Sequence, residues 1–132
     1  MRTTLLLGLC VTCFSALADA NANWVAVQGG SWTVPDADVK QMAAEIQSAA
    51  ASAGRRGELV KDVGAYVIQF KGSGPAKRRI VELRGSCEVD GKSRAELRKS
   101  FFNVLDGGEC YFSATWDATA RKFMFFQFNG VA

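Results

Sequence analysis

The chain has 132 residues, of which 48% are hydrophobic, with no histidine and a formal net charge of +3. The length fits a single domain, and so small a charge excess does not indicate a nucleic-acid partner. Because histidine is the commonest general base and the commonest metal ligand, its absence favours a protein that is not an enzyme and holds no cofactor.

The first twenty residues predict a secretory signal peptide. Arg2 gives a short basic start, residues 5–17 are mostly apolar, and Ala18-Asp19-Ala20 resembles a cleavage site. The apolar run is shorter than the roughly 20 residues that a membrane-spanning helix needs. We therefore expect cleavage without stable membrane insertion. The expected product is one domain, residues 21–132, in the periplasm or outside the cell.

The cysteines predict one disulfide bridge. Cleavage would remove Cys10 and Cys13 and leave Cys87 and Cys110. Two cysteines in an exported domain favour a structural bridge, because the environment outside the cytoplasm permits oxidation. Such a bridge should contribute on the order of 3 kcal/mol by restricting the unfolded chain. A redox or metal pair is the weaker alternative, since these two cysteines lack CxxC spacing and no histidine completes a zinc site.

The segment at 21–31 leads into the main helix. Trp24-Val25-Ala26-Val27 fits a short edge strand. Gly29 and Gly30 follow it, and this pair predicts a hinge or a place where two backbone segments approach closely.

One long helix is predicted at 33–53. Its N-terminus has a capping pattern in Thr33 and Asp36, with Pro35 in the first turn, where a missing N–H costs little. Gly54 is expected to end the helix. Apolar residues recur three and four positions apart and form one stripe. The stripe consists of Val39, Met42, Ala43, Ile46, Ala50 and Ala53.

Strand-like alternation dominates the chain after the helix. Gly72-Ser73-Gly74-Pro75 predicts a turn, as does Asp106-Gly107-Gly108. The polar stretch 88–100 includes a short helical turn near 94–99, and 101–105 fits a strand or a strand end. The predicted strands are 63–71, 79–87, 109–116 and 122–129.

The last predicted strand is apolar on both faces. Strict alternation places Phe123 and Phe125 on one face and Met124, Phe126 and Phe128 on the other. A strand of this kind is usually central in a sheet or covered by another element. The order of elements predicts an α+β fold, in which a four- to five-stranded antiparallel sheet wraps a single N-terminal helix.

Two groups of basic residues are candidates for binding. One group begins a predicted strand, and the other lies in the polar stretch before 101. Such groups can bind an anionic component of the envelope or an acidic patch on a protein. Interleaved acids such as Glu82 and Glu96 fit a solvated surface equally well. The basic residues are Lys77, Arg78, Arg79, Arg94, Arg98 and Lys99.

Three tryptophans stand near predicted loops. Trp116 falls at a strand end just before a loop, and Trp24 and Trp32 flank the glycine pair. Large aromatic side chains at such positions serve as anchors for a binding partner or as lids over the edge of a core. Both interpretations stay open at this level.

The order of these elements resembles the cystatin-like architecture. A glycine pair precedes one helix, a strand enters the glycine-rich stretch 69–74, a cysteine-bearing strand follows, and a tryptophan lies at the last hairpin. In cystatins, an N-terminal glycine and two hairpins form a wedge that enters the cleft of papain-like peptidases. The resemblance implies a wedge made of Gly29, Gly30, Gln69, Phe70, Lys71, Gly72, Ser73, Gly74 and Trp116.

These observations lead us to expect a non-catalytic protein that binds another protein. Its most concrete form is an inhibitor or immunity-type protein of a secreted or periplasmic enzyme. The chain also resembles small exported bacterial proteins with an Asp-Gly-Gly-x-Cys strand, here 106–110. One alternative is a small-molecule pocket protein with the ketosteroid-isomerase-like cone fold. Another is a binder of an anionic envelope component through its basic surface. The oligomeric state is open.

Overall fold

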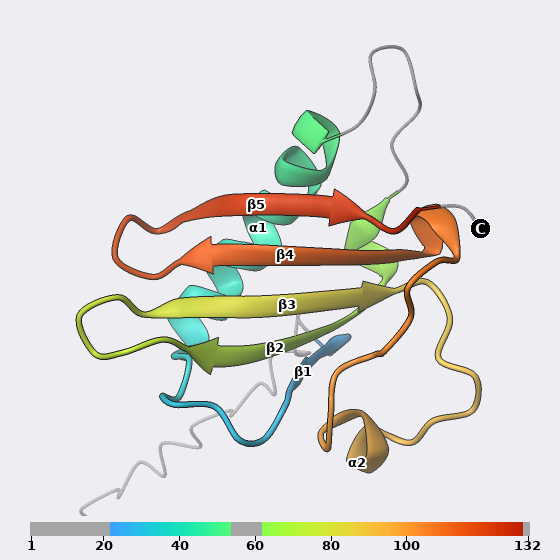
Figure 1. Ribbon diagram of the computed structural model, residues 1–132, viewed down its shortest axis with the longest axis horizontal. Helices are drawn as coiled ribbons and strands as arrows, with labels where there is room; N and C mark the ends of the chain where they lie inside the picture. The colour runs from blue at the N-terminus through green and yellow to red at the C-terminus, as the bar shows by residue number, and fades with distance from the viewer. Residues whose placement is uncertain (1–21, 54–61, 131–132) are drawn as a thin grey trace, which may run out of the picture.

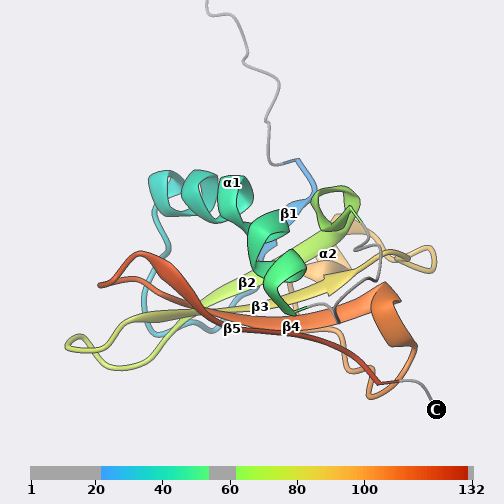
Figure 2. The same cartoon turned by 90° about the horizontal axis from the view of Figure 1, so that it is seen from above.

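The computed structural model describes residues 22–53 and 62–130. They form one main helix and a five-stranded sheet, which confirms the predicted α+β class. Helix α1, Asp36–Ala53, lies along one face of the sheet, as Figures 1 and 2 show. The predicted signal peptide, Cys10, Cys13 and Gly54 lie outside the described residues. The strands follow chain order across the sheet: β1 Trp24–Ala26, β2 Val67–Ser73, β3 Ile80–Ser86, β4 Tyr111–Asp117 and β5 Lys122–Phe128.

The sheet is mixed, so the prediction of purely antiparallel pairing was wrong. β1 runs parallel to β2, with Trp24 opposite Ile68, whereas β2 to β5 pair in antiparallel fashion. The cause is the helix between β1 and β2, because a helical crossover returns the chain to the end from which the first strand began. The edge position predicted for the first strand is confirmed.

The helix begins three residues later than predicted. The carbonyl of Pro35 accepts hydrogen bonds from the N–H groups of Asp38 at 3.0 Å and Val39 at 3.2 Å, so Pro35 precedes the first turn. The residues before it stay extended because the sheet holds them. Trp32 forms an isolated bridge to Gly72 at the end of β2.

Two predicted boundaries of β2 were also wrong. The first residues of the predicted strand, Val63–Ala65, form a 3-10 turn, whose Gly64 N–H donates to the side chain of Asp62 at 3.0 Å. At the other end, Gly72 and Ser73 belong to the strand. The turn therefore begins at Gly74, which has a φ of 82°.

The core lies between α1 and the inner face of the sheet. Val39, Met42, Ile46 and Ala50 of the predicted stripe are buried there. Removing these apolar surfaces from water is the main favourable contribution to the fold. The predicted alternation of β2, β3 and β4 is confirmed by the strand residues in this core, which are Ile68, Phe70, Val81, Leu83, Phe112, Ala114 and Trp116.

β5 lies at an edge of the sheet, so the first predicted alternative, a central strand, was wrong, whereas the second, a strand covered by another element, agrees with its packing against α1. The β4–β5 register shifts between Thr115 and Trp116, which leaves Met124 as an extra residue in a β-bulge. The bulge puts Phe123 and Phe125 on opposite faces, although strict alternation had placed them together. The β5 side chains that pack against the core are Phe123, Phe126 and Phe128.

The predicted disulfide is present and closes a long loop. Cys87 and Cys110 are joined, with their Cα atoms 4.9 Å apart. We call residues 88–109 the disulfide loop. It contains the short helix α2, Arg94–Leu97, close to the predicted helical turn. Residues 101–105 are irregular, so the strand predicted there was wrong.

Gln69 fixes the disulfide loop to the outer face of the sheet, away from α1. Its side chain is fully buried. Its Nε2 donates to the carbonyls of Leu97 and Ser100, each at 2.8 Å, and its Oε1 accepts from the N–H of Phe102 at 2.7 Å. These partners hold the irregular part of the loop, which has no ladder to satisfy its backbone.

Replacing Gln69 with alanine should lower the free energy of unfolding by about 3 kcal/mol, because three backbone groups of the loop would lose the fully buried amide that satisfies them. Urea denaturation of the oxidised protein measures this change. Gln127→Ala is the matched control, since Gln127 lies in the same row of the sheet and is exposed. It should cost less than about 0.5 kcal/mol. Equal effects would contradict the role given to Gln69.

Tyr66 makes the stability of the fold depend on pH in the alkaline range. Its hydroxyl donates to the carbonyl of Glu109. Burial, and secondly the negative charge of Glu109, raise the pKa of Tyr66 above its usual value. The folded chain therefore holds the phenol proton more tightly than the unfolded chain does. The resulting stability is complete below the unfolded pKa of about 10 and is lost as the pH rises through the higher folded pKa.

We expect the free energy of unfolding to fall above pH about 10, and to fall less steeply in Tyr66→Phe than in the wild type. Denaturation in urea at a series of pH values tests this. Tyr111→Phe controls for the general effect of losing a tyrosine hydroxyl. A slope that does not change in Tyr66→Phe would refute the coupling.

Candidate functional site

The two hairpin turns lie at the same end of the sheet (Figure 1). One joins β2 to β3 at 74–79, and the other joins β4 to β5 at 118–121. The N–H of Ala118 donates to the carbonyl of Arg79 at 3.1 Å and ties the two turns together. We call this region the hairpin end. It comprises residues 31–34, 74–79 and 118–122.

Trp32 supports the first turn from the segment that precedes α1. Its indole Nε1 donates to the carbonyls of Ser73 at 2.9 Å and Ile80 at 3.2 Å, which belong to the two strands of the hairpin. The guanidinium of Arg79 lies 5.3 Å from the centre of the indole ring, within the range of a cation–π contact. Trp32 therefore acts as a brace for the turn, and its polar and aromatic faces are both engaged.

Arg121 fixes the second turn to the start of α1. Its Nη1 lies 2.6 Å from Oδ1 of Asp38, and its Nη2 donates to the side chain of Gln41. Gln41 in turn donates to the Arg121 carbonyl at 3.1 Å. The guanidinium also lies 5.5 Å from the Trp116 ring. Asp38 thus has a partner as well as a favourable place in the first helical turn.

The hairpin end also exposes basic side chains that make no intramolecular polar contact with the described residues. The side chains of Lys77, Arg78 and Lys122 are exposed and form no ion pair, hydrogen bond or ring contact with any described residue. They extend the positive field of the turns into solvent, where it can attract an acidic surface. The other two basic residues of this region, Arg79 and Arg121, are held by Trp32 and α1.

The second predicted basic group lies elsewhere. Arg94, Arg98 and Lys99 lie in or next to α2, at the opposite end of the molecule from the turns (Figure 1). Arg94 donates to the carbonyls of Ala22 at 2.7 Å and Trp24 at 3.0 Å, so it fastens α2 to the start of β1. The two groups do not form one basic surface.

Several residues of the predicted wedge come together, and two of them, Gly72 and Trp116, are buried. A side-chain atom at Gly30 would lie 2.7 Å from the carbonyl of Gly72, which confirms the predicted close approach. Gly72 is aligned through Val81 with Trp116, and Trp116 is fully buried under α1. The interpretation of Trp116 as a surface anchor is therefore corrected, because it belongs to β4 and not to the turn that follows.

The remaining wedge residues divide between sheet and surface. Gln69 faces the disulfide loop and Phe70 is in the core, so neither is offered to a partner. The cause is that β2 continues through Ser73, whereas the resemblance placed a binding hairpin at 69–74. Gly29 is exposed, and Lys71, Ser73 and Gly74 are half-buried.

A cleft of about 440 Å³ lies on the outer face of the sheet, between the strands and residues 101–105. Arg84 and Phe101 form part of its wall, with the guanidinium 5.1 Å from the ring centre. The inner side of the sheet differs, because core side chains fill the space against α1. An open groove of about 300 Å³ remains between the C-terminal end of α1 and β5, lined by Ala49, Ser52, Ala53 and residues 123–126.

Sequence reasoning missed Lys122 and the Arg121–Asp38 ion pair. The two charged partners are far apart in the chain, and their charges alone gave no signal. A usable signal was the short spacing between Asp117 and Lys122, since so tight a turn places its basic residues at a hairpin tip. Asp117 accepts hydrogen bonds from the N–H groups of Thr119 and Ala120 at 2.8 and 2.9 Å.

Comparisons of the chain with protein-family models, curated proteins and solved structures gave no match. The described residues contain no helix that is both long enough and apolar enough to cross a membrane. The site must therefore be interpreted from its own geometry.

Replacing Asp38 with alanine should destabilise the protein by about 1 kcal/mol more than replacing Asp36, because only Asp38 pairs with Arg121. Both variants lose a negative charge near the helix N-terminus, so the difference isolates the ion pair. Thermal or urea denaturation gives the two values. Indistinguishable values would mean that the ion pair does not anchor the second turn.

Proposed function

We propose that the chain is an exported, non-catalytic binding protein whose hairpin end contacts an acidic surface of a protein partner. The observation that carries this proposal is that both turns meet at one end and expose the side chains of Lys77, Arg78 and Lys122, which contact no partner among the described residues. Export is supported by the signal-like N-terminal sequence and by the disulfide, which needs oxidising conditions to persist.

The rigidity of the hairpin end favours a protein partner. Trp32 braces one turn, Arg121 fixes the other, and a backbone hydrogen bond joins them. Pre-organised turns lose little conformational entropy when they bind, which is how inhibitors with exposed loops reach high affinity. The most concrete form of the proposal is an inhibitor or immunity-type protein of a secreted or periplasmic enzyme.

The cystatin-like arrangement forms part of this proposal in a modified form. A segment before the helix and two hairpin turns meet at one end, as in a cystatin wedge. Trp116 and Gly72 are buried and do not contribute to the surface. The residues that the turns expose are mainly basic. The specificity would then come from charge, with Lys77 and Arg78 at the most projecting turn. Positive turns steer association with an acidic partner and select against basic ones.

The double charge reversal Lys77→Glu/Arg78→Glu should weaken partner binding at least tenfold, because it replaces attraction by repulsion at the projecting turn. The matched control is Arg98→Glu/Lys99→Glu, which makes the same change of charge near α2 and should leave binding within about twofold. The measurement is quantitative capture from envelope and culture fractions by the oxidised proteins, at several salt concentrations.

One protein enriched by the wild type and the α2 control, but not by the turn variant, would support the proposal. Equal loss in both variants would contradict it, since binding would then follow net charge. Enrichment of anionic polymers or lipids in place of a protein would favour the envelope-binding alternative. Their retention should fall steeply with salt, because exposed charges are screened over about 10 Å at 0.1 M.

A further inference from the structure

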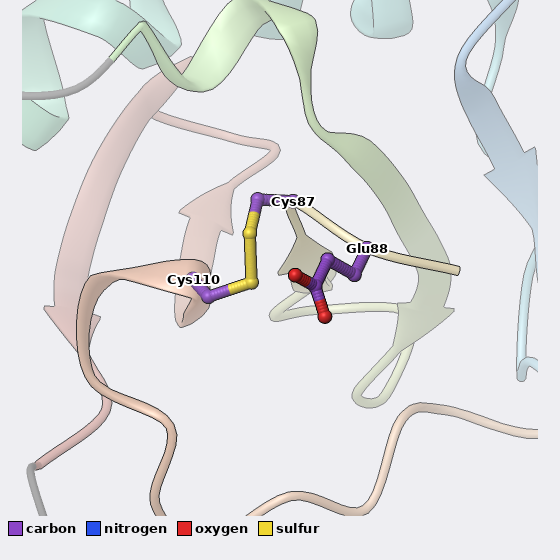
Figure 3. A group of neighbouring side chains, drawn as sticks. All are labelled: Cys87, Glu88 and Cys110. Atoms are coloured by element: carbon purple, nitrogen blue, oxygen red, sulfur yellow. A yellow bond between two sulfur atoms is a disulfide. The ribbon is translucent and has the colours of Figure 1, made fainter. Parts of the chain in front are cut away.

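The disulfide lies beside a carboxylate at the far end of the sheet from the turns. Figure 3 shows the Glu88 side chain next to the bridge between Cys87 and Cys110. One ligand atom from each of these three residues lies within 4.8 Å of the other two. Cys87 and Glu88 are exposed and Cys110 is half-buried, so the group is open to solvent.

A backbone hydrogen bond holds the two cysteines together in addition to the bond between their sulfur atoms. The N–H of Cys87 donates to the carbonyl of Cys110 at 2.8 Å, next to the last β3–β4 pair, Ser86 with Tyr111. This backbone contact would remain after reduction. The two thiols would therefore stay side by side.

Hydrogen bonds also fix the neighbours of each cysteine. The N–H of Glu88 donates to Oγ of the buried Ser86 at 3.1 Å, and that hydroxyl donates to the Glu88 carbonyl. On the other side, the hydroxyl of Tyr66 donates to the carbonyl of Glu109. The backbone that carries all three ligands is thus held by contacts other than the bridge.

We propose that the reduced protein binds one thiophilic divalent cation of the Zn²⁺ class through the thiolates of Cys87 and Cys110 and the carboxylate of Glu88. Two thiolates and one oxygen suit zinc, and three protein ligands leave a fourth position for water. Ligand atoms around one zinc ion lie about 3.5–4 Å apart, by the bond lengths of tetrahedral sites. In the scheme, the two sulfur atoms move apart after reduction and the Glu88 side chain turns toward them to reach that range.

The bridge and the metal are mutually exclusive in this scheme. A dithiol reductant supplies two electrons and two protons, becomes a disulfide itself, and converts the bridge to two thiols. The cation then displaces both thiol protons as it binds. The oxidised protein has no thiolate to offer, so metal binding reports the redox state of the site. This inference does not rest on the proposed function of the hairpin end.

The test uses the full chain with Cys10 and Cys13 replaced by serine, so that only the bridge cysteines can bind. A phosphine reduces the protein, because an added thiol would itself bind the metal. Cd²⁺ then reports thiolate coordination by its charge-transfer absorption, and Zn²⁺ affinity follows from competition with a chromophoric chelator. The reduced protein should bind one equivalent of metal, and the oxidised protein none.

Glu88→Gln should weaken Zn²⁺ binding about tenfold or more. Mutating a residue that only hydrogen-bonds to a metal ligand lowers metal affinity roughly 10–100-fold, and losing a ligand should cost at least as much. Glu109→Gln is the matched control, because it removes the acid next to the other cysteine and should leave affinity unchanged. Equal affinities in the two variants, or no stoichiometric binding after reduction, would overturn the proposal. Loss of the native circular dichroism on reduction would overturn it too, since the backbone would not hold the ligands in place.

Discussion

The buried side-chain amide of Gln69 is the contact on which the outer half of the molecule depends. Gln69 lies on β2 at the point where the disulfide loop crosses the sheet. The donor and acceptor groups of its side chain bind three backbone groups of that loop. An irregular segment can lie against a sheet only if its backbone is satisfied in this way. The contact also removes Gln69 from any role at the surface, although its place in a glycine-rich stretch had indicated a binding loop.

The same sheet separates two chemically different ends. At one end the turns expose lysine and arginine side chains, and the contacts of Trp32 and Arg121 keep those turns in place. At the other end the bridge, Glu88 and α2 form a region rich in hydrogen bonds to backbone carbonyls. A basic binding surface and a redox-sensitive cysteine pair can therefore occupy one small domain without sharing residues.

The parts of the structure that depend on local patterns could be predicted from the sequence. The helix stripe, the alternation of three strands and the cysteine pair gave the α+β class and the disulfide, because periodicity and oxidation follow from nearby residues. The bulge at Met124 could not be predicted, since one extra residue changes the facing of a strand without changing its composition. The inward position of Trp116 depended on where a strand ends, which is the least reliable part of such predictions. The parallel pairing of β1 follows from the crossover by α1, and the predicted order of strand, helix and strand carried a signal for it that the antiparallel prediction did not use.

Hydrogen–deuterium exchange of the oxidised protein, with and without its captured partner, shows whether the hairpin end is the binding surface. Amide exchange reports which backbone segments become protected on binding. Protection should appear at 74–79 and 118–122 and leave α2 and the disulfide loop unchanged. Protection confined to the disulfide loop or to β5, with no change at the turns, would contradict the assignment of the hairpin end.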